Sequence, residues 1–373
     1  MPRPPVWHAA CQPTTSNRQL TTIIVPTISA DRLTRICVDC FETLGVSPER
    51  ARLVSDHIVS NCLYGHDTHG AILIVRFADD LEGGRIVPDA LTEIVETGPC
   101  TARADGHRGF GPLTMTDVMD AAIAMSRESG ISAISVTNTN HIGILWGYLK
   151  SAADAGMIGM LWCGAGPQGG FVAPPGGKKR ALGTNPLGIG IPAGDMRPFV
   201  LDISTAICAA GRIKGFRREG ERVPEGWIID DDGNPTTDPE DFHETAEVIK
   251  GALLHMAGYK GFGLAVATEL LTHVMSGYGS VYKQDFEEGN SAFVVAIDPE
   301  RFISREVFQA EVDRVMQYLK STPRYPDVDE ILIPGEIEFN TRAERERNGI
   351  PIGEGVWSRI REVAERLEIE LPE

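Results

Sequence analysis

The stretch Leu182-Gly183-Thr184-Asn185-Pro186 carries the first indication of the fold, together with two segments of similar character. These are Gly65-His66-Asp67-Thr68-His69-Gly70 and Asn140-His141-Ile142-Gly143. Each segment is a polar turn that contains glycine and lies beside an apolar run, and binding and catalytic residues concentrate in such turns. The three segments are therefore the first candidates for a functional site.

The composition favours a globular protein that binds neither nucleic acid nor an anionic membrane. The 373 residues are enough for about two or three domains, and 42% hydrophobic residues support a full-sized core. The net charge is −17, whereas proteins that bind nucleic acid or anionic membranes need basic patches. No apolar run reaches the ~18 residues of a membrane-spanning helix, and no secretory signal is recognisable. We therefore expect no membrane partner and a cytoplasmic location.

The N-terminal region and the cysteines carry little functional signal. Residues 1–27 are rich in Pro and Thr and lack a periodic apolar face, so they are expected to be a disordered extension. The seven cysteines include Cys37 and Cys40 in a CxxC pattern. A zinc site would need a second pair, so two core-facing thiols on one helix are expected, with a redox or metal role as the alternative. This pattern fits a reducing compartment.

Apolar periodicity predicts helical ends around a β-rich middle. Helices are expected over residues 30–44, 48–64, 71–81, 112–128, 259–275, 304–319 and 356–367. Short strands are expected over residues 131–136, 157–163, 188–191, 199–203 and 290–298. Residues 213–243 form a long polar stretch with few apolar anchors, and a connection of that kind is usually functional or mobile.

One motif suggests a Rossmann fold but lies in the wrong context. Residues 164–169 read Gly-Ala-Gly-Pro-Gln-Gly and follow an apolar strand, as a GxGxxG motif would. In a Rossmann fold this motif opens a helix whose N-terminus holds a pyrophosphate. Here Pro167 and the Pro-Pro-Gly-Gly run at 174–177 cannot continue a helix. A loop is therefore expected in place of a Rossmann turn.

Two further patterns leave alternatives open. His66 and His69 are three residues apart and could share a metal ion with His141, which would make the protein a His/Asp metal hydrolase. A single histidine in a glycine-flanked turn is also often a structural hydrogen-bonding group. Lys260 opens a predicted helix, where its charge opposes the helix dipole, so it is either a phosphate ligand or a plain surface lysine.

Seven ordered segments together resemble the type-2 malate/L-lactate dehydrogenase family over roughly residues 28 to 353. Besides the three turns, they are Phe199 to Thr205, the Pro-Glu-Gly-Trp loop at 224–239, Tyr259 to Ala265 and Pro334-Gly335-Glu336. The resemblance implies an α/β (α+β) fold with a largely antiparallel-sheet cofactor domain of non-Rossmann type. It places that nicotinamide domain at 111–299. A helical substrate and dimerisation domain would then comprise both chain ends, residues 28–110 and 300–373.

The resemblance also implies the chemistry. The family transfers a hydride between NAD or NADP and a 2-oxo or 2-hydroxy acid, and relatives reduce cyclic imines (piperideine- or pyrroline-2-carboxylate) or oxidise ureidoglycolate. His69 would be the proton donor, with Thr68 in the place of the usual serine. Asp202 would pair with His69 and raise its pKa, because a carboxylate stabilises the imidazolium. His141 matches a second histidine with a catalytic role in some members.

The same resemblance assigns binding residues. Many members carry an arginine four residues after the histidine, but this chain has Leu73 there and Arg76 further on, an arrangement shared with the Gly-His-Asp-Ser-His-Gly branch of hydroxycarboxylate dehydrogenases. A Leu73 that faces the pocket would favour an apolar or aromatic substrate, whereas the missing arginine leaves a non-catalytic ligand-binding homologue as an alternative. The remaining substrate residues would be Thr184 and Asn185. The cofactor residues would be Asp202, Ile203, Ser204, Lys260, Gly261, Gly335 and Glu336. No metal is expected. The protein is expected to be a homodimer that binds a small 2-oxo acid.

Overall fold

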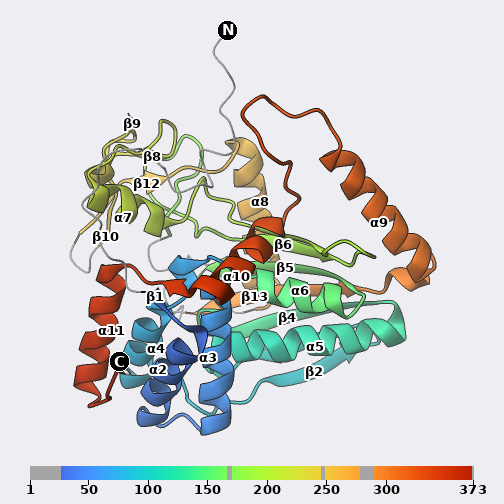
Figure 1. Ribbon diagram of the computed structural model, residues 1–373, viewed down its shortest axis with the longest axis horizontal. Coiled ribbons are helices and arrows are strands. Elements are labelled where there is room, and N and C mark those ends of the chain that lie inside the picture. The colour runs from blue at the N-terminus through green and yellow to red at the C-terminus, as the bar shows by residue number, and fades with distance from the viewer. Residues whose placement is uncertain (1–26, 166–169, 245–247, 278–288, 372–373) are drawn as a thin grey trace.

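The computed structural model describes residues 27–165, 170–244, 248–277 and 289–371 (Figure 1). The expected disordered extension comprises residues 1–27. All of it except Thr27 lies outside the described part. Strand β1 (Thr27–Ile28) pairs with β14 (Ile350–Pro351), so Thr27, which was expected to be part of the extension, belongs to a strand. No helix in the described ranges is both long and apolar enough to cross a membrane.

Both chain ends contribute to one helical part, at the lower left of Figure 1. Its helices are α2 (Ala30–Thr43), α3 (Pro48–Leu63), α4 (Ile72–Glu82) and α11 (Glu354–Arg366). Their apolar faces meet in one core that includes Leu33, Phe41, Phe77, Phe110 and Ile360. The predicted helical periodicity is therefore confirmed, because buried residues recur every three or four positions along each helix.

A seven-stranded sheet forms the second part, and its strand order is β2-β3-β4-β13-β5-β6-β7. All neighbouring pairs are antiparallel except β3 with β4. The strands are β2 (Glu93–Gly98), β3 (Thr101–Asp105), β4 (Ile131–Thr139), β5 (Ile158–Ala165), β6 (Leu187–Ile191), β7 (Phe199–Ile203) and β13 (Asn290–Ile297). Helices α5 (Gly111–Ser129) and α6 (Trp146–Asp154) pack on the sheet. The mixed α/β class with a largely antiparallel sheet is thus confirmed.

The GxGxxG segment does not open a helix within the described residues. Gly164 and Ala165 end strand β5, and residues 166–169 lie outside the described part. Beyond them, Val172 bridges Leu182 and Leu253, and the next described helix is α7 (Ala210–Glu219). The strand and helix are therefore not joined by the tight turn on which a dinucleotide-binding Rossmann motif depends.

The polar stretch 213–243, expected to be a functional or mobile connection, belongs to a small folded lobe at the upper left of Figure 1. The lobe contains α7, strands β8 (Ile228–Ile229), β9 (Pro235–Thr236), β10 (His243–Glu244), β11 (Ile249–Lys250) and β12 (Ala252–Leu253), and a 3-10 turn, η2 (Pro239–Asp241). Its core includes Val172, Ile213, Val223, Ile228 and Phe242. These apolar residues are far apart in sequence, so local periodicity could not reveal that they meet.

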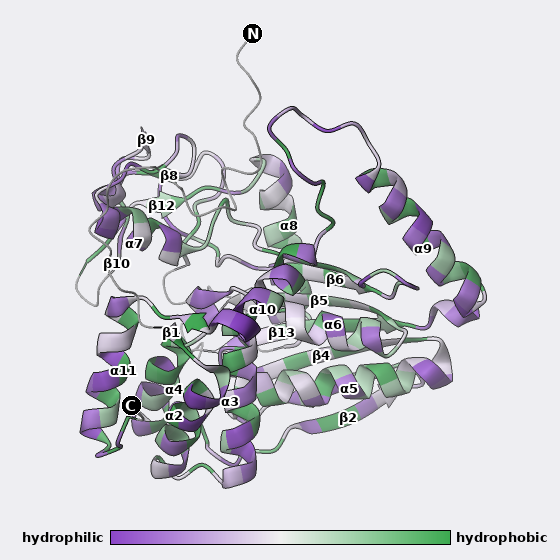
Figure 2. Ribbon diagram, viewed as in Figure 1, coloured by the Kyte–Doolittle hydropathy of each residue, from purple (hydrophilic) through white to green (hydrophobic). Residues whose placement is uncertain are grey.

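Three more helices complete the chain. Helix α8 (Tyr259–Glu269) continues into a π-helical segment, η3 (Leu270–Val274). Together they cover nearly the whole helix predicted over 259–275, but its second part is π-helical instead of α-helical. Helix α9 (Arg305–Lys320) follows a 3-10 turn, η4 (Pro299–Arg301), and projects from the body of the molecule (Figure 1). Helix α10 (Glu336–Asn348) is strongly polar (Figure 2) and has no buried residue, yet it contacts α3.

Candidate active site

The turn that carries the first histidine pair is a single 3-10 turn, η1 (Asp67–His69), between α3 and α4. Asn61 Nδ2 on α3 donates to the His69 carbonyl at 2.9 Å, and the Ala71 N–H donates to Cys62 Sγ at 3.1 Å. From α10, the Arg345 guanidinium donates to both carboxylate oxygens of Asp67, at 2.5 and 3.0 Å. The turn is therefore held by α3, which directly precedes it, and by α10, which is remote in sequence.

His69 and His141, predicted from different segments, lie together. Their ring centroids are 5.3 Å apart and the rings are inclined by 20°. Thr68 Oγ1 lies 2.9 Å from His69 Nδ1. The Gly143 N–H donates to His141 Nδ1 at 3.2 Å. An Nδ1 atom that accepts this bond carries no proton, so the neutral His141 ring holds its proton on Nε2.

The surroundings keep both rings neutral. Burial, followed by the charges of His66 and Arg76, lowers the pKa of His69 to about 4. The pKa of His141 is lowered well below its usual value by burial, and then by Arg76 and His69. The expectation that Asp202 raises the pKa of His69 is therefore wrong, because desolvation and nearby positive charge dominate.

A third histidine, His57 on α3, belongs to the same cluster and was missed in the sequence. Its ring stacks on Tyr148 at a centroid distance of 5.5 Å, and burial followed by the charge of His69 lowers its pKa to about 4. Tyr148 in turn donates to the Ile142 carbonyl at 2.6 Å, which braces the segment that carries His141. A usable signal was present, because His57 and Asn61 lie one helical turn apart beside apolar residues.

Arg76 and Leu73 lie in different environments on α4. The Arg76 side chain is 47% exposed, and its charge acts on both His69 and His141. It also lies 3.6 Å from Asp80. Leu73 is only 2% exposed and packs within the helical core. The expectation that Leu73 faces a substrate pocket is therefore wrong, because its position on α4 points it into the helical core.

Asp202 is used differently from the expected pairing with His69. Its Oδ2 accepts hydrogen bonds from the Leu145 and Trp146 N–H groups at 2.8 and 3.0 Å, at the start of α6. Burial raises its pKa, against the opposing effects of His66 and of these two donors. The carboxylate thus caps a helix N-terminus from strand β7, and His66 is the nearby histidine that acts on it.

The turn at 182–186 is tied to its neighbours by both of its expected substrate residues. The Thr184 carbonyl accepts from Ser204 Oγ at 3.1 Å and from Thr205 Oγ1 at 2.8 Å. Asn185 is fully buried, and its amide donates to the Ala265 carbonyl at 3.1 Å. A direct substrate contact by the Asn185 side chain is therefore not what this structure shows; the residue joins the turn to α8.

The expected cofactor residues lie on three neighbouring segments. Ile203 and Ser204 end strand β7, and Gly335 packs on the same strand, since a Cβ on Gly335 would stand 3.2 Å from the Val200 nitrogen. Gly261 is buried in the first turn of α8, where the exposed Lys260 side chain has no ion-pair partner within the described ranges. An exposed lysine at a helix start is a suitable ligand for a phosphate.

Glu336 differs from its expected role. Its Oε2 accepts from the Ile333 N–H at 2.8 Å and from Lys320 Nζ at 2.6 Å. The carboxylate is therefore engaged within the chain, where it fixes the start of α10, and a contact with a cofactor hydroxyl would have to displace these donors.

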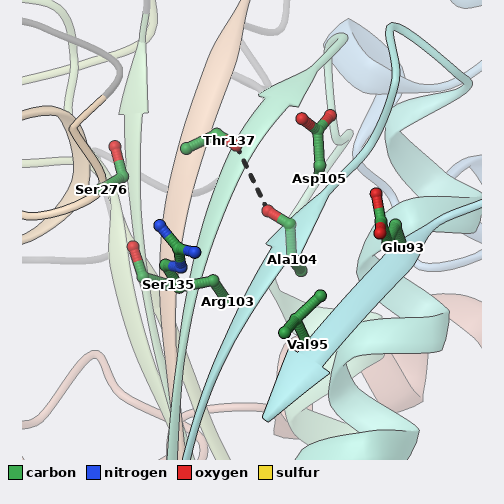
Figure 3. Close-up of a pocket in the computed structure, with 8 residues that line it drawn as sticks. All are labelled: Glu93, Val95, Arg103, Ala104, Asp105, Ser135, Thr137 and Ser276. Atoms are coloured by element: carbon green, nitrogen blue, oxygen red, sulfur yellow. Dashed lines mark hydrogen bonds between the residues drawn. The ribbon is translucent and has the colours of Figure 1, made fainter. Parts of the chain in front are cut away.

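The small lobe approaches the catalytic turn. A Cβ on Gly211, at the start of α7, would stand 3.3 Å from Thr68 Cγ2. A separate open pocket of about 270 Å³ lies on strands β2, β3 and β4 (Figure 3). Its lining includes Glu93, Arg103 and Asp105 and none of the residues predicted for the site. The candidate site at the junction of α3, α4 and the His141 segment is therefore separate from that pocket.

Comparison with known proteins agrees with this fold. Residues 28–361 match the malate/L-lactate dehydrogenase family. Malate dehydrogenase of Pyrococcus horikoshii is 33% identical over 351 residues, or 92% of this chain and 96% of the relative. L-sulfolactate dehydrogenase of Methanocaldococcus jannaschii is 32% identical over 343 residues, or 90% and 96% of the two chains. The crystal structure of malate dehydrogenase from Entamoeba histolytica superimposes with a TM-score of 0.86 at 28% identity, covering 93% of this chain and 99% of the other.

The chain therefore belongs to the malate/L-lactate dehydrogenase family, as the sequence motifs predicted. It is an oxidoreductase that acts on a CH–OH group, and dehydrogenases of this family depend on a pyridine nucleotide.

Proposed function

We propose that this enzyme transfers a hydride between NAD or NADP and a small 2-oxo or 2-hydroxy acid at the His69–His141 pair. The observation that carries the proposal is the stacking of these two rings at 5.3 Å beside Arg76, the cation whose charge acts on both. Such a reaction needs a proton carrier and a carboxylate anchor close to one carbon atom. The bound nicotinamide would supply or accept the hydride.

The two histidines divide the proton chemistry. His69 can donate Nδ1–H to Thr68 Oγ1, 2.9 Å away, which leaves Nε2 as a base for the hydroxyl proton of a 2-hydroxy acid. His141 presents Nε2–H, because its Nδ1 accepts from Gly143, so it can donate a hydrogen bond to the substrate oxygen. A pKa of about 4 keeps free His69 in the basic form, and a bound anionic substrate would raise that pKa toward neutrality.

Arg76 is proposed as the anchor for the substrate carboxylate. Its guanidinium is half exposed, and its nearest acidic partner is Asp80 at 3.6 Å, outside hydrogen-bonding range. Arg76→Ala should raise KM for a 2-oxo acid about 10- to 100-fold, the worth of one charged hydrogen bond. With the uncharged 2-oxo amide as control, the same variant should change KM little.

The cofactor is proposed to bind along the end of β7, with Ile203, Ser204, Gly335 and Lys260 around it. The fit rests on the exposed Lys260 ammonium at the start of α8 and on the close packing of Gly335 against β7. We propose a cofactor domain over 111–299 and a helical domain from the two chain ends, since one apolar core unites residues of both ends.

A homodimer is also proposed. Helix α9 and its approach expose large apolar side chains, among them Phe302 at 80% and Val315 at 57%, which a second copy could cover. Light scattering should give about twice the 40.5 kDa chain mass, and a chain mass at micromolar concentration would contradict it.

The decisive experiment is a panel of 2-oxo acids, with one cyclic imine included, assayed with NADH and with NADPH at the nicotinamide absorbance band. Turnover of at least one 2-oxo acid is expected. Turnover of the imine alone would move the enzyme to imine reduction, and cofactor binding without any turnover would favour a non-catalytic ligand-binding protein.

A further inference from the structure

Three polar side chains form a buried network that the proposed chemistry does not use. They are Asn185 (0% exposed), Glu269 (5%) and His273 (0%). Asn185 comes from the turn at 182–186, Glu269 ends α8, and His273 lies in the π-helical segment that follows. Burial of a carboxylate is costly unless donors compensate it, so a cluster of this kind requires a reason.

The contacts within the network are specific. Asn185 Nδ2 donates to Glu269 Oε2 at 3.1 Å and also to the Ala265 carbonyl at 3.1 Å. Glu269 Oε1 lies 3.2 Å from His273 Nδ1, one helical turn further on. Oε2 therefore accepts a hydrogen bond from Asn185, whereas Oε1 lies at ion-pair distance from His273 without a hydrogen bond, and Asn185 is held by two successive turns of α8. Its backbone φ of +35° is one that asparagine tolerates better than most residues.

The network also reaches the end of strand β5. A Cβ on Gly164 would stand 2.4 Å from His273 Cε1 and 2.4 Å from Thr272 Oγ1, so this position accepts only glycine. Asn290 Nδ2 donates to the Gly164 carbonyl at 2.9 Å from the neighbouring strand. Glu269 thus contacts the turn at 182–186 through Asn185, and His273, its other neighbour, packs against the end of β5.

Helix α8 is the element that presents Lys260 at its other end. The π-helical turn at Leu270–Val274 is a rare geometry that is found mostly at functional sites. Because α8 is short, a shift of its buried end changes the placement of Lys260 relative to the end of β7. A network that fixes one end of α8 therefore fixes the direction in which its first turn points.

We propose that Asn185, Glu269 and His273 are positioning residues that set the affinity for the nicotinamide cofactor by holding α8 against the turn at 182–186. This inference rests on the proposed cofactor site at Lys260. It assigns to the conspicuous Asn185 an action through Glu269, in place of contact with the substrate.

The test compares Glu269→Ala, Glu269→Gln and Asn185→Gly with a matched control, Asp313→Ala. Asp313 is a similarly buried carboxylate (8% exposed) that accepts from the Gly194 and Asp195 N–H groups at 3.0 and 2.7 Å, between α9 and the loop after β6. For each full-length protein, the melting temperature, the Kd for NADH and NADPH by nicotinamide fluorescence, and kcat at saturating cofactor are measured.

Glu269→Ala and Asn185→Gly should weaken cofactor binding at least about tenfold, with a smaller change in kcat. Glu269→Gln, which still offers an oxygen to Asn185, should stay within about threefold of the natural protein. Asp313→Ala should lose a similar amount of thermal stability and keep its cofactor Kd.

Two results would overturn the inference. One is a Kd within about twofold of the natural protein in both Glu269→Ala and Asn185→Gly. The other is a Glu269→Gln protein as weak as Glu269→Ala, since the hydrogen bond to Asn185 would then not matter. If Glu269→Ala does not fold, Asn185→Gly and Glu269→Gln decide. Lys260→Ala separates the two proposals: an unchanged Kd there, with a weakened Kd in Glu269→Ala, removes only Lys260 from the cofactor site.

Discussion

At the scale of single residues, the proposed active site is a cluster of histidines whose surroundings differ. His57, His69 and His141 come from three different segments, and burial lowers the pKa of each. His69 lies 2.9 Å from the Thr68 hydroxyl, His57 stacks on Tyr148, and His141 has its proton fixed on Nε2 by the Gly143 N–H. Three identical side chains therefore acquire three different environments.

Replacing His69 by Ala should remove the proton carrier. We expect kcat to fall roughly 10²- to 10⁴-fold, the usual worth of a general acid–base group, while the cofactor Kd stays unchanged. Steady-state kinetics and nicotinamide fluorescence measure the two quantities. A loss below about tenfold in kcat would transfer the role to His141.

The neutral histidines should also make the protein sensitive to acid. His57 and His69 have pKa values of about 4 in the folded protein and 6.5 as ordinary histidines, so below the higher value the unfolded chain binds more protons. The free energy of unfolding should therefore fall as the pH drops from about 6.5 toward about 4, by about 3 kcal/mol for one such histidine.

Urea unfolding at about pH 7 and about pH 4.5 measures this loss. The variant His57→Gln, which does not titrate, should lose about 2 kcal/mol less between the two conditions. Equal losses in both proteins would place the responsible groups elsewhere.

At the scale of elements, helix α10 supports the catalytic turn from outside the helical core. Its Phe339 is partly buried and packs edge-on against Trp146 at a centroid distance of 5.0 Å. Polar contacts add to this attachment, such as Arg345 to Asp67 and Arg342 to the Tyr64 hydroxyl at 2.8 Å. His66 adds a contact of 3.6 Å with Glu338 of the same helix. The turn that carries His69 is therefore held by a contact between residues 278 positions apart in the sequence.

Arg345→Ala should loosen η1 and lower kcat about tenfold, because small displacements of a catalytic group are costly in rate. Its effect on stability should be small, about 1 kcal/mol, since Asp67 is more than half exposed. Arg347→Ala is the matched control on the same helix, as Arg347 bonds only its own helix through the Ala343 carbonyl at 2.9 Å. Equal kinetics in both variants would show that α10 does not act on the turn.

Asp202 offers a second test at this scale, because it joins β7 to the start of α6. Asp202→Ala should cost about 1–2 kcal/mol in unfolding free energy, as the loss of a helix cap does. Asp202→Asn retains an oxygen for Leu145 and Trp146, so turnover should stay within about tenfold of the natural enzyme. A loss of turnover as large as that of His69→Ala, in a stable Asp202→Asn protein, would restore the catalytic role that the sequence resemblance implied.

At the scale of the whole molecule, the first and last parts of the described chain lie side by side. Strand β1 pairs with β14, which precedes α11, and Ile28 is buried in the helical core at 4% exposure. The two ends of the described chain therefore meet in the helical part (Figure 1).

A chain that begins at Pro26 should fold and turn over like the full protein, because residues 1–25 have no periodic apolar face to bury. A chain that begins at Ser29 lacks β1 and buried Ile28, and it should lose about 2 kcal/mol in unfolding free energy while Ser29 still caps α2. Melting temperatures and kcat of the two truncated proteins provide the comparison. A clear loss in the longer protein would show that the N-terminal residues pack on the rest.

The sequence by itself determined the family, the mixed α/β class and most of the long helices. Periodic apolar residues are local signals, and ordered motifs such as the turns at His69 and His141 identify a family whatever the distances between them. The short strands of the small lobe and helix α10 were not predicted, because their apolar contacts are few and come from distant segments.

Only the tertiary structure decided what each site residue does. Leu73 lies in the core, Asp202 caps α6, Asn185 binds Glu269, and Glu336 is held by Lys320. Motif position says which residues a family shares, but burial, charge and hydrogen bonding depend on neighbours that may be hundreds of residues away. The low pKa of His69 shows this most directly, since it arises from the desolvation that folding imposes and from the charges of His66 and Arg76.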